Sequence, residues 1–272
     1  VVVLMMIIVG TEISLAQLVA SLRRPTALLG GTLAQWLLLP LLAALAIWLL
    51  QPPPALAGGL LLVASSPGGA LSNTYCSVGR LNVAFSVALT AVSGFVALAA
   101  MPLLLAAIGP AALGVEAVGV PVAELSLRLL LFLLAPVALG MTLRHFFPAA
   151  LQRHFRAIRT AGLSLLALFL AVVFLDQRHA VLDLFWESAR LTATFTLLAL
   201  LAGWLTGSAL RLNPTDRAVL AVEFAVRNVG IAAVLALTTF HQQEFAAFGA
   251  LFVLIEAPIL LAVLLARERL KA

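Results

Sequence analysis

Long apolar segments fill most of this chain of 272 residues, and short polar connections separate them. A helix needs about 20 apolar residues to cross the hydrocarbon core of a bilayer. Nine segments meet this length: 1–20, 26–50, 55–78, 82–108, 121–143, 160–178, 188–210, 216–239 and 245–266. Because the connections are short, apart from a polar loop expected at 144–159, the pattern predicts an all-α polytopic membrane protein with one transmembrane domain over residues 1–272.

Two of the predicted spans are interrupted near their middle. The first contains the helix breaker Pro67-Gly68-Gly69, and the second carries Glu223, Arg227 and Asn228 at the expected bilayer centre. A broken helix leaves backbone N–H and C=O groups without partners, at several kcal/mol each, unless it lines a cavity enclosed by protein. Many secondary transporters build ion and substrate sites from such helices. The two interrupted spans run in opposite directions, which favours two inverted repeats.

Composition and charge agree with a membrane location and exclude other classes of protein. The chain is 64% hydrophobic and 10% charged, with a mean hydropathy of +1.17, far from the range of soluble domains. Its net charge of +5 does not indicate nucleic-acid binding, because the basic residues alternate by loop. They gather on one side at Arg23, Arg24, Arg80, 144–159, Arg211, Arg217 and the tail. The positive-inside rule then predicts a multi-pass protein with a cytoplasmic C-terminus. Arg outnumbers Lys 15 to 1, and Ala and Leu dominate, which favours a bacterial protein and hence an inner membrane.

Charged residues inside the predicted spans are candidates for function, since each costs ~2.5–3.5 kcal/mol at a helix centre on insertion scales. Arg128 lies near a span end, where its side chain can reach the interface, and we expect a mainly structural role. Glu223 and Arg227 are four residues apart and would pair on one face of a continuous helix. Glu256 adds a second carboxylate, and a bound monovalent cation would neutralise the surplus negative charge of the three.

Hydroxyl and amide oxygens cluster in sequence beside the first break. Ser72 and Asn73 follow the break directly, and Ser86 and Thr90 are four apart on the next span, hence on one face. A hard monovalent cation such as Na⁺ prefers oxygen ligands of this kind. The cluster therefore favours a sodium site.

The same residues carry a resemblance to a known family. The runs 66–69, 72–73 and 82–90, with Gln35 and Pro40 before them and Glu223 and Asn228 after them, resemble the bile acid:sodium symporter family over nearly the whole chain. The resemblance implies a fold of ten helices in two inverted repeats, of which this chain looks like helices two to ten. It also implies a panel of about 1–20 and 121–178, and a core of about 26–108 and 188–266 with two crossing broken helices. The chain opens inside a hydrophobic run without a Met, so we expect a preceding segment.

The resemblance also implies sodium sites. The family's first site maps onto the five residues Ser72, Asn73, Ser86, Thr90 and Glu223, all of them intact. The second site maps onto Gln35, Glu223 and a glutamine at the position of Arg227. Arg carries only donors and stays protonated, so it cannot ligate Na⁺. We therefore expect one bound Na⁺, with the Arg227 guanidinium in place of the second.

The substrate contacts match the family less closely. The resemblance directs attention to Ala70, Leu71, Asn228 and Glu256 as substrate-binding positions. The family often has a Thr in place of Ala70, and a His-Asn pair on its last helix becomes Glu256-Ala257 here. A small organic anion other than a bile acid is therefore expected, held at the positive N-terminal end of the half-helix that starts near Ala70.

We predict a secondary active transporter that moves a small organic anion with Na⁺ by alternating access. A proton-coupled or sodium-independent carrier or exporter of the same fold is an alternative, with Glu223 or Glu256 as the proton site. A membrane sensor that does not transport is an alternative of another class. No catalytic residues are expected, because the chain has no HExxH motif and its four His lie in loops or at span ends. Na⁺ is the only metal expected, and the oligomeric state stays open.

Overall fold

A computed structural model describes residues 2–12, 25–112, 122–176 and 183–269, and the regular structure within these ranges is helical. The first half contains α1 (Val2–Glu12), α3 (Pro25–Leu50), α4 (Pro54–Ala64), α5 (Leu71–Val78), α6 (Val83–Ala112), α7 (Val122–Leu129) and the π-helical segment η1 (Leu130–Leu134). The second half contains α8 (Ala135–Phe146), α9 (Pro148–Asp176), α11 (Phe185–Ala209), α12 (Pro214–Ala225), α13 (Val229–Thr238) and α14 (Gln243–Arg269). Residues 13–20 and 177–178 of the predicted spans, and the basic residues Arg23 and Arg24, lie outside the described residues.

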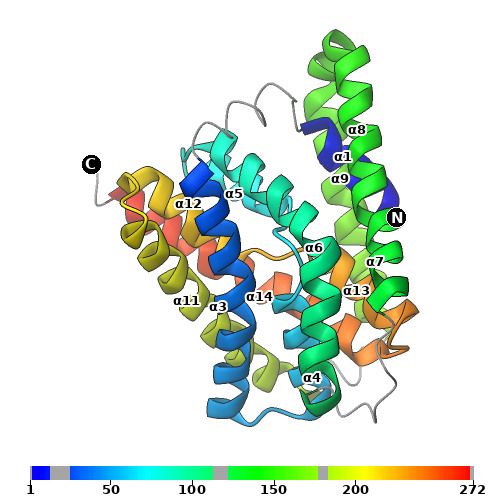
Figure 1. Cartoon of the computed structure of the whole chain (residues 1–272), viewed down its shortest axis with the longest axis vertical. Coiled ribbons are helices and arrows are strands. Elements are labelled where there is room, and N and C mark those ends of the chain that lie inside the picture. Colours follow the sequence, from blue (N-terminus) through cyan, green and yellow to red (C-terminus); the bar gives the residue numbers. More distant parts are fainter. Residues whose placement is uncertain (1, 13–24, 113–121, 177–182, 270–272) are drawn as a thin grey trace.

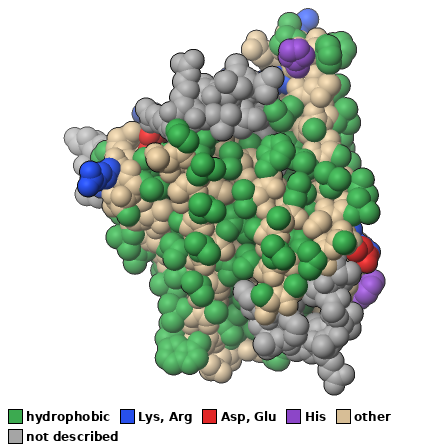
Figure 2. All heavy atoms as spheres, viewed as in Figure 1, with side chains coloured by type: hydrophobic (Ala, Val, Ile, Leu, Met, Phe, Trp, Pro, Cys, Tyr) green, Lys and Arg blue, Asp and Glu red, His purple; other side chains and the backbone are tan. Residues whose placement is uncertain are grey.

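The long helices have the length and composition of membrane spans. Within the described residues, five are long and apolar enough: Pro25–Leu50, Val83–Ala107, Val122–Phe146, Phe185–Ala209 and Gln243–Arg269. Large apolar side chains such as Leu37 and Trp48 are exposed on the helix surfaces. Figure 2 shows hydrophobic side chains spread over the described part of one face, with charged side chains only near its edges. A soluble protein rarely exposes an apolar surface of this extent. The structure thus confirms an all-helical, multi-pass membrane protein.

The helices form two groups that lie side by side (Figure 1). One group contains α1, α7, η1, α8 and α9, and α1 packs mainly against α8. The other contains α3 to α6 and α11 to α14, with α11 packed on both α12 and α3. Gly10 and Gly140 permit the close packing of α1 on α8, because a Cβ on Gly140 would lie 2.1 Å from the carbonyl oxygen of Ile7.

The predicted loop at 144–159 is wrong. α8 continues to Phe146 and α9 begins at Pro148, so helix covers nearly all of this polar stretch. The proline suits the first turn of a helix, where its missing N–H costs no hydrogen bond. A basic helix end can extend beyond the bilayer without burying charge, which is why polarity alone did not mark a loop here.

Both predicted breaks are confirmed, and they meet each other. α4 ends at Ala64 and α5 begins at Leu71, while α12 ends at Ala225 and α13 begins at Val229. The two unwound segments run antiparallel and form a bridge between Gly68 and Arg227. The Gly69 N–H donates to the Val226 carbonyl at 3.3 Å, and the Asn228 N–H donates to the Pro67 carbonyl at 2.9 Å. Each break therefore satisfies backbone groups of the other, which removes part of the cost of unwinding in a membrane.

Glycine is required where the segments cross. A Cβ on Gly69 would lie 2.5 Å from the carbonyl oxygen of Arg227, closer than real side chains approach. A Cβ on Gly68 would lie 3.0 Å from Glu223 Oε2. The glycines thus let two backbones and one carboxylate share the same small volume.

Candidate functional site

The carboxylate of Glu223 lies at the helix crossing, fully buried in the last turn of α12. Three hydroxyls surround it. Ser72 Oγ, from the start of α5, and Ser86 Oγ, from α6, each donate to Glu223 Oε1 at 2.5 Å. Thr90 Oγ1 is 3.1 Å from Oε1 and 3.2 Å from Oε2. The spacing of Ser86 and Thr90 by one helical turn turns both side chains toward the same carboxylate.

Asn73 completes this oxygen cluster. Its Oδ1 lies 2.9 Å from Ser86 Oγ, and Ser72 Oγ lies 3.4 Å from both Ser86 Oγ and Thr90 Oγ1. The three hydroxyls have only three protons to share among the amide oxygen, the carboxylate and one another. The cluster is therefore rich in oxygen lone pairs, poor in protons and negatively charged, which suits a hard cation.

The cluster does not resemble a site for a transition metal. Within the described ranges, no group of three or more His, Cys, Asp or Glu side chains lies close enough to hold a metal ion. One carboxylate with hydroxyl and amide oxygens carries a single formal negative charge. That charge matches a monovalent cation.

A second oxygen cage lies one turn further along the chain, around Arg227. The guanidinium is 3% exposed and donates through Nη1 to Gln35 Oε1 at 3.2 Å and to the Glu223 carbonyl at 3.4 Å. Nη2 donates to the Ser66 carbonyl. Arg227 Nε and Gln35 Nε2 have no hydrogen-bond partner among the residues the structure describes. A fixed cation thus occupies a cage of one amide oxygen and two backbone carbonyls.

The ion pair that a continuous helix would form between the described residues Glu223 and Arg227 is absent. In the described part of the chain, neither Glu223 nor Glu256 lies within 4.0 Å of a cationic nitrogen of Arg227, although Glu223 and Arg227 still attract each other through space. The helix ends at Ala225, so the two side chains lose the geometry of residues four apart on one helix. Glu256 is 1% exposed, its Oε1 has no partner among the described residues, and it interacts electrostatically with Tyr75.

A cavity of about 50 Å³ lies beside the crossing, between the two groups of helices. Its lining combines Pro67, Gly68, Ala70, Thr90, Gly94 and Asn228 with Met6, Leu133, Val137 and Met141 from the α1–α8 side. Of the four expected substrate positions, Ala70 and Asn228 line this cavity, whereas Leu71 and Glu256 do not. The lining carries no charged side chain. Its polar groups are an amide, a hydroxyl and the unwound backbone.

Asn228 has a structural as well as a lining role. Its Oδ1 accepts from the Ile231 N–H at 3.1 Å and so caps α13, and its Nδ2 lies 3.7 Å from Met6 Sδ. The side chain thus joins the start of the half-helix to the opposite wall of the cavity. A ligand that displaced Met6 would gain the amide N–H as a donor.

Two supporting groups were not predicted from the sequence. Ser93 Oγ accepts from the Gly68 N–H at 3.1 Å and so holds the first break. Asp216 accepts from Asn82 Nδ2 at 2.9 Å and Asn213 Nδ2 at 2.8 Å, which ties the start of α12 to the start of α6. Ser93 lies seven residues after Ser86, on the same helix face, and Asn213-Pro214 is a typical helix start. Both signals were present in the sequence.

Known proteins resemble this chain. Residues 1–184 match the sequence model of the Sodium Bile acid symporter family. The chain is 37% identical over 138 residues to the "Probable sodium/metabolite cotransporter BASS1, chloroplastic" of Arabidopsis thaliana, covering 51% of this chain and 33% of that relative. It is 30% identical over 225 residues to the "P3 protein" of Homo sapiens, covering 80% and 46%. It is 26% identical over 222 residues to the "Uncharacterized sodium-dependent transporter YocS" of Bacillus subtilis (strain 168), covering 80% and 66%. The chain thus spans a third to two thirds of the length of these relatives.

Proposed function

The chain belongs to the sodium bile acid symporter family, and we propose that it is a secondary transporter that couples Na⁺ to the movement of a small organic anion. The family and the relatives from Arabidopsis thaliana and Bacillus subtilis are named as symporters, cotransporters or transporters, not as enzymes. The oxygen cluster around Glu223 carries the proposal, because Ser72, Ser86 and Thr90 converge on one buried carboxylate. Na⁺ binding would join α5 and α6 to α12 and neutralise Glu223.

We assign the sodium ligands to Ser72, Asn73, Ser86, Thr90 and Glu223. These residues come from both broken helices and from α6, so the ion would stabilise the crossing itself. The substrate cavity shares Thr90 and the unwound backbone with this cluster. Sodium and substrate would therefore favour the same arrangement, which is the physical basis of coupling.

We propose that a single Na⁺ moves in each cycle. The Arg227 guanidinium holds Gln35 Oε1 and the carbonyl oxygens of Ser66 and Glu223, which are oxygen ligands of the kind a second Na⁺ would use. Arg227 is fixed in the protein and does not move with the cargo. One Na⁺ and one monovalent anion would then move with no net charge.

The wider architecture is part of the proposal. Residues 1–20 and 121–178 would form a panel, and 26–108 and 188–266 a core, in nine helices of a ten-helix fold with two inverted repeats. The core would rock against the panel, with the cavity between them open to each side in turn. The C-terminus would lie in the cytoplasm of a bacterial inner membrane.

The test is the melting temperature of the purified protein in Na⁺ and in K⁺. A ligand at 100 times its Kd stabilises the native state by about 2.7 kcal/mol, so Na⁺ but not K⁺ should raise the melting temperature. Glu223→Ala should abolish the difference. Equal melting temperatures in the two salts would contradict sodium binding.

A proton-coupled carrier of the same fold is the second candidate. Glu256 favours it, because this carboxylate is buried without a hydrogen bond to Oε1 from any described residue. A carboxyl group that accepts a proton from solution and releases it on the other side is the minimum that proton coupling requires. Uptake that follows an imposed pH gradient and ignores Na⁺ would support this reading.

A further inference from the structure

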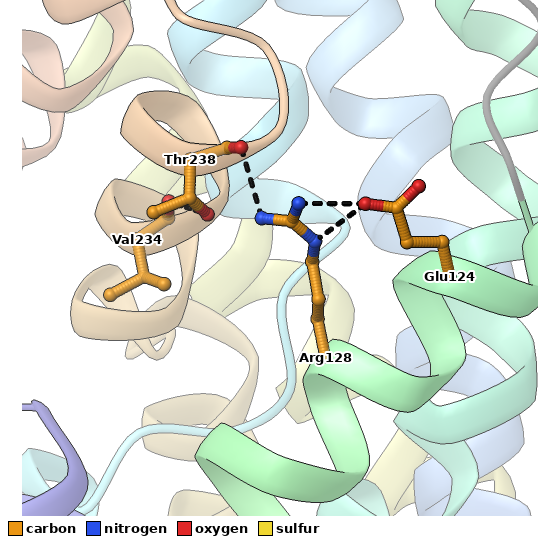
Figure 3. Close-up of polar contacts among 4 residues, drawn as sticks. All are labelled: Glu124, Arg128, Val234 and Thr238. Carbon is orange, nitrogen blue, oxygen red and sulfur yellow. Dashed lines mark hydrogen bonds and ion pairs between the residues drawn. The ribbon is translucent and has the colours of Figure 1, made fainter.

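α7 carries two side-chain donors that reach α6 and α13 in the opposite group of helices. Ser126 Oγ donates to the Leu98 carbonyl of α6 at 2.9 Å. Arg128 Nη1 donates to the Thr238 carbonyl of α13 at 2.9 Å, as Figure 3 shows. Both acceptors are backbone oxygens. These two bonds bridge the panel side of the molecule to the core side.

Arg128 is held in position by its own helix (Figure 3). Its Nε and Nη2 donate to Glu124 Oε1 at 3.1 and 2.7 Å, one turn earlier on α7. Its remaining Nη1 then points at the last turn of α13, where carbonyl groups have no helical partner and carry the negative end of the helix dipole. Glu124 thus presents the guanidinium to α13.

The two contacts lie at the same end of the cavity. Along α6, Leu98 follows the lining residues Thr90 and Gly94. Along α13, Thr238 is the last residue, about 15 Å from the lining residue Asn228. Arg128 precedes the lining residue Leu133 on the α7–η1 side. α7 therefore lies at this end, beyond the residues that line the cavity.

We propose that Ser126 and Arg128 form a latch that is made while this end of the cavity is shut and broken when it opens. The inference rests on the proposed transport cycle. Water can replace the Arg128 donor, because the Thr238 carbonyl lies at the end of α13 and this contact is exposed. The Leu98 carbonyl lies within α6 and its bond to Ser126 is partly buried, so water would reach it only as this end opens. The Glu124–Arg128 pair lies within one helix and survives the motion, so no charge loses its partner. η1 follows directly, and π-helical turns are often found at functional joints.

The experiment uses a cysteine in the cavity as a reporter of opening. Gly94 lines the cavity, and a Cβ there meets nothing within 4 Å, so Gly94→Cys should be tolerated. Cys76 is the chain's only cysteine and is buried, and Cys76→Ala gives a clean background. A membrane-impermeant maleimide is applied to right-side-out and inside-out vesicles. The labelling rate from each face reports how often that face is open.

Arg128→Ala should raise labelling from the face that holds Glu124 by about tenfold, the value of one hydrogen bond from a charged donor, and lower labelling from the other face. Ser126→Ala should raise it by a smaller factor, and Arg128→Lys should fall between parent and Arg128→Ala. Arg190→Ala is the matched control, because Arg190 pairs with Glu187 at 3.7 Å in an exposed position within α11. It should leave both rates unchanged.

The outcomes separate the latch from the transport cycle. Equal labelling rates in the parent, Arg128→Ala and Ser126→Ala proteins would overturn the latch, whichever ion and substrate the protein transports. Labelling from one face only in every variant would overturn both the latch and alternating access. Because the readout needs neither sodium nor substrate, a wrong cargo assignment does not affect it.

Discussion

The cages around Glu223 and Arg227 lie one helical turn apart in sequence, yet they enclose groups of opposite charge. The first surrounds a carboxylate with three hydroxyls. The second surrounds a guanidinium with an amide oxygen and two carbonyls. Both are oxygen-rich, but only the second contains its own cation. The difference shows that an oxygen cage inside a membrane protein can keep its oxygen ligands while an arginine side chain, in place of a bound ion, supplies the positive charge.

The break in α12 makes this contrast possible. In a continuous helix, Glu223 and Arg227 would point the same way and neutralise each other. Unwinding after Ala225 separates them and frees the Glu223 carbonyl to face the guanidinium. The carboxylate is then left to hydroxyls, which can rotate and turn their lone pairs toward an incoming ion.

The largest effect is expected at the first cage. Glu223→Gln keeps the shape of the side chain but removes the charge that would bind Na⁺. Loss of one member of a buried charge pair costs about 3–5 kcal/mol, which corresponds to more than about 100-fold in sodium affinity. Sodium-dependent uptake by proteoliposomes measures it. Uptake that remains sodium-dependent with unchanged affinity would remove Glu223 from the sodium site.

The next largest effect is expected at the second cage, where a substitution should change the number of Na⁺ ions that bind in each cycle. Arg227→Gln removes the fixed cation and adds an amide oxygen beside Gln35 and the Ser66 carbonyl. The Hill coefficient for Na⁺ should rise from about one to nearly two, since it is limited by the number of sites. Transport should also become sensitive to membrane voltage, because one more charge moves per cycle.

The control for this substitution is Arg227→Met, which removes the charge without adding a ligand. It should keep a Hill coefficient near one and lower the melting temperature, since three oxygen acceptors lose their donor. A parent protein that already shows a coefficient near two would contradict the role of Arg227 as a substitute cation.

Sequence reasoning identified the first cage well because polar side chains in apolar spans are costly and therefore conspicuous. Ser72, Ser86 and Thr90 stood out in this way, and the break beside them suggested a cavity. The second cage was only partly predictable. Two of its three acceptors, the carbonyls of Ser66 and Glu223, become available through unwinding, and no side-chain pattern records them.

Tertiary contacts explain the other differences. Helical spacing would pair Glu223 with Arg227 only in a continuous helix, and the break after Ala225 prevents this pair. Arg128 was expected to reach only the membrane interface, whereas it contacts α13, which lies 110 residues away in sequence. Such distant partners depend on how the two groups of helices pack, and a linear pattern does not contain that information.

A smaller effect is expected from one ligand of the first cage. Thr90→Val keeps the shape of the side chain and removes a hydroxyl that lies 3.1 Å from Glu223 Oε1. A hydrogen bond to a charged group is worth about 1.5–3 kcal/mol, so sodium affinity should fall by about tenfold or more without loss of the second cage. Isothermal titration with Na⁺ measures the affinity. Ser93→Ala, which loosens the break instead, should lower stability more than affinity.

The smallest effect is expected at Glu256, which belongs to neither cage. Glu256→Gln replaces a buried carboxylate whose Oε1 has no described partner with a neutral amide of similar shape. Sodium affinity should change by less than about threefold, or ~0.6 kcal/mol, and the melting temperature should not fall. Both are measured with the same purified protein. If uptake instead loses its response to an imposed pH gradient while Glu223→Gln leaves that response intact, the coupling ion is a proton held at Glu256, and the first cage is a structural hydrogen-bond network.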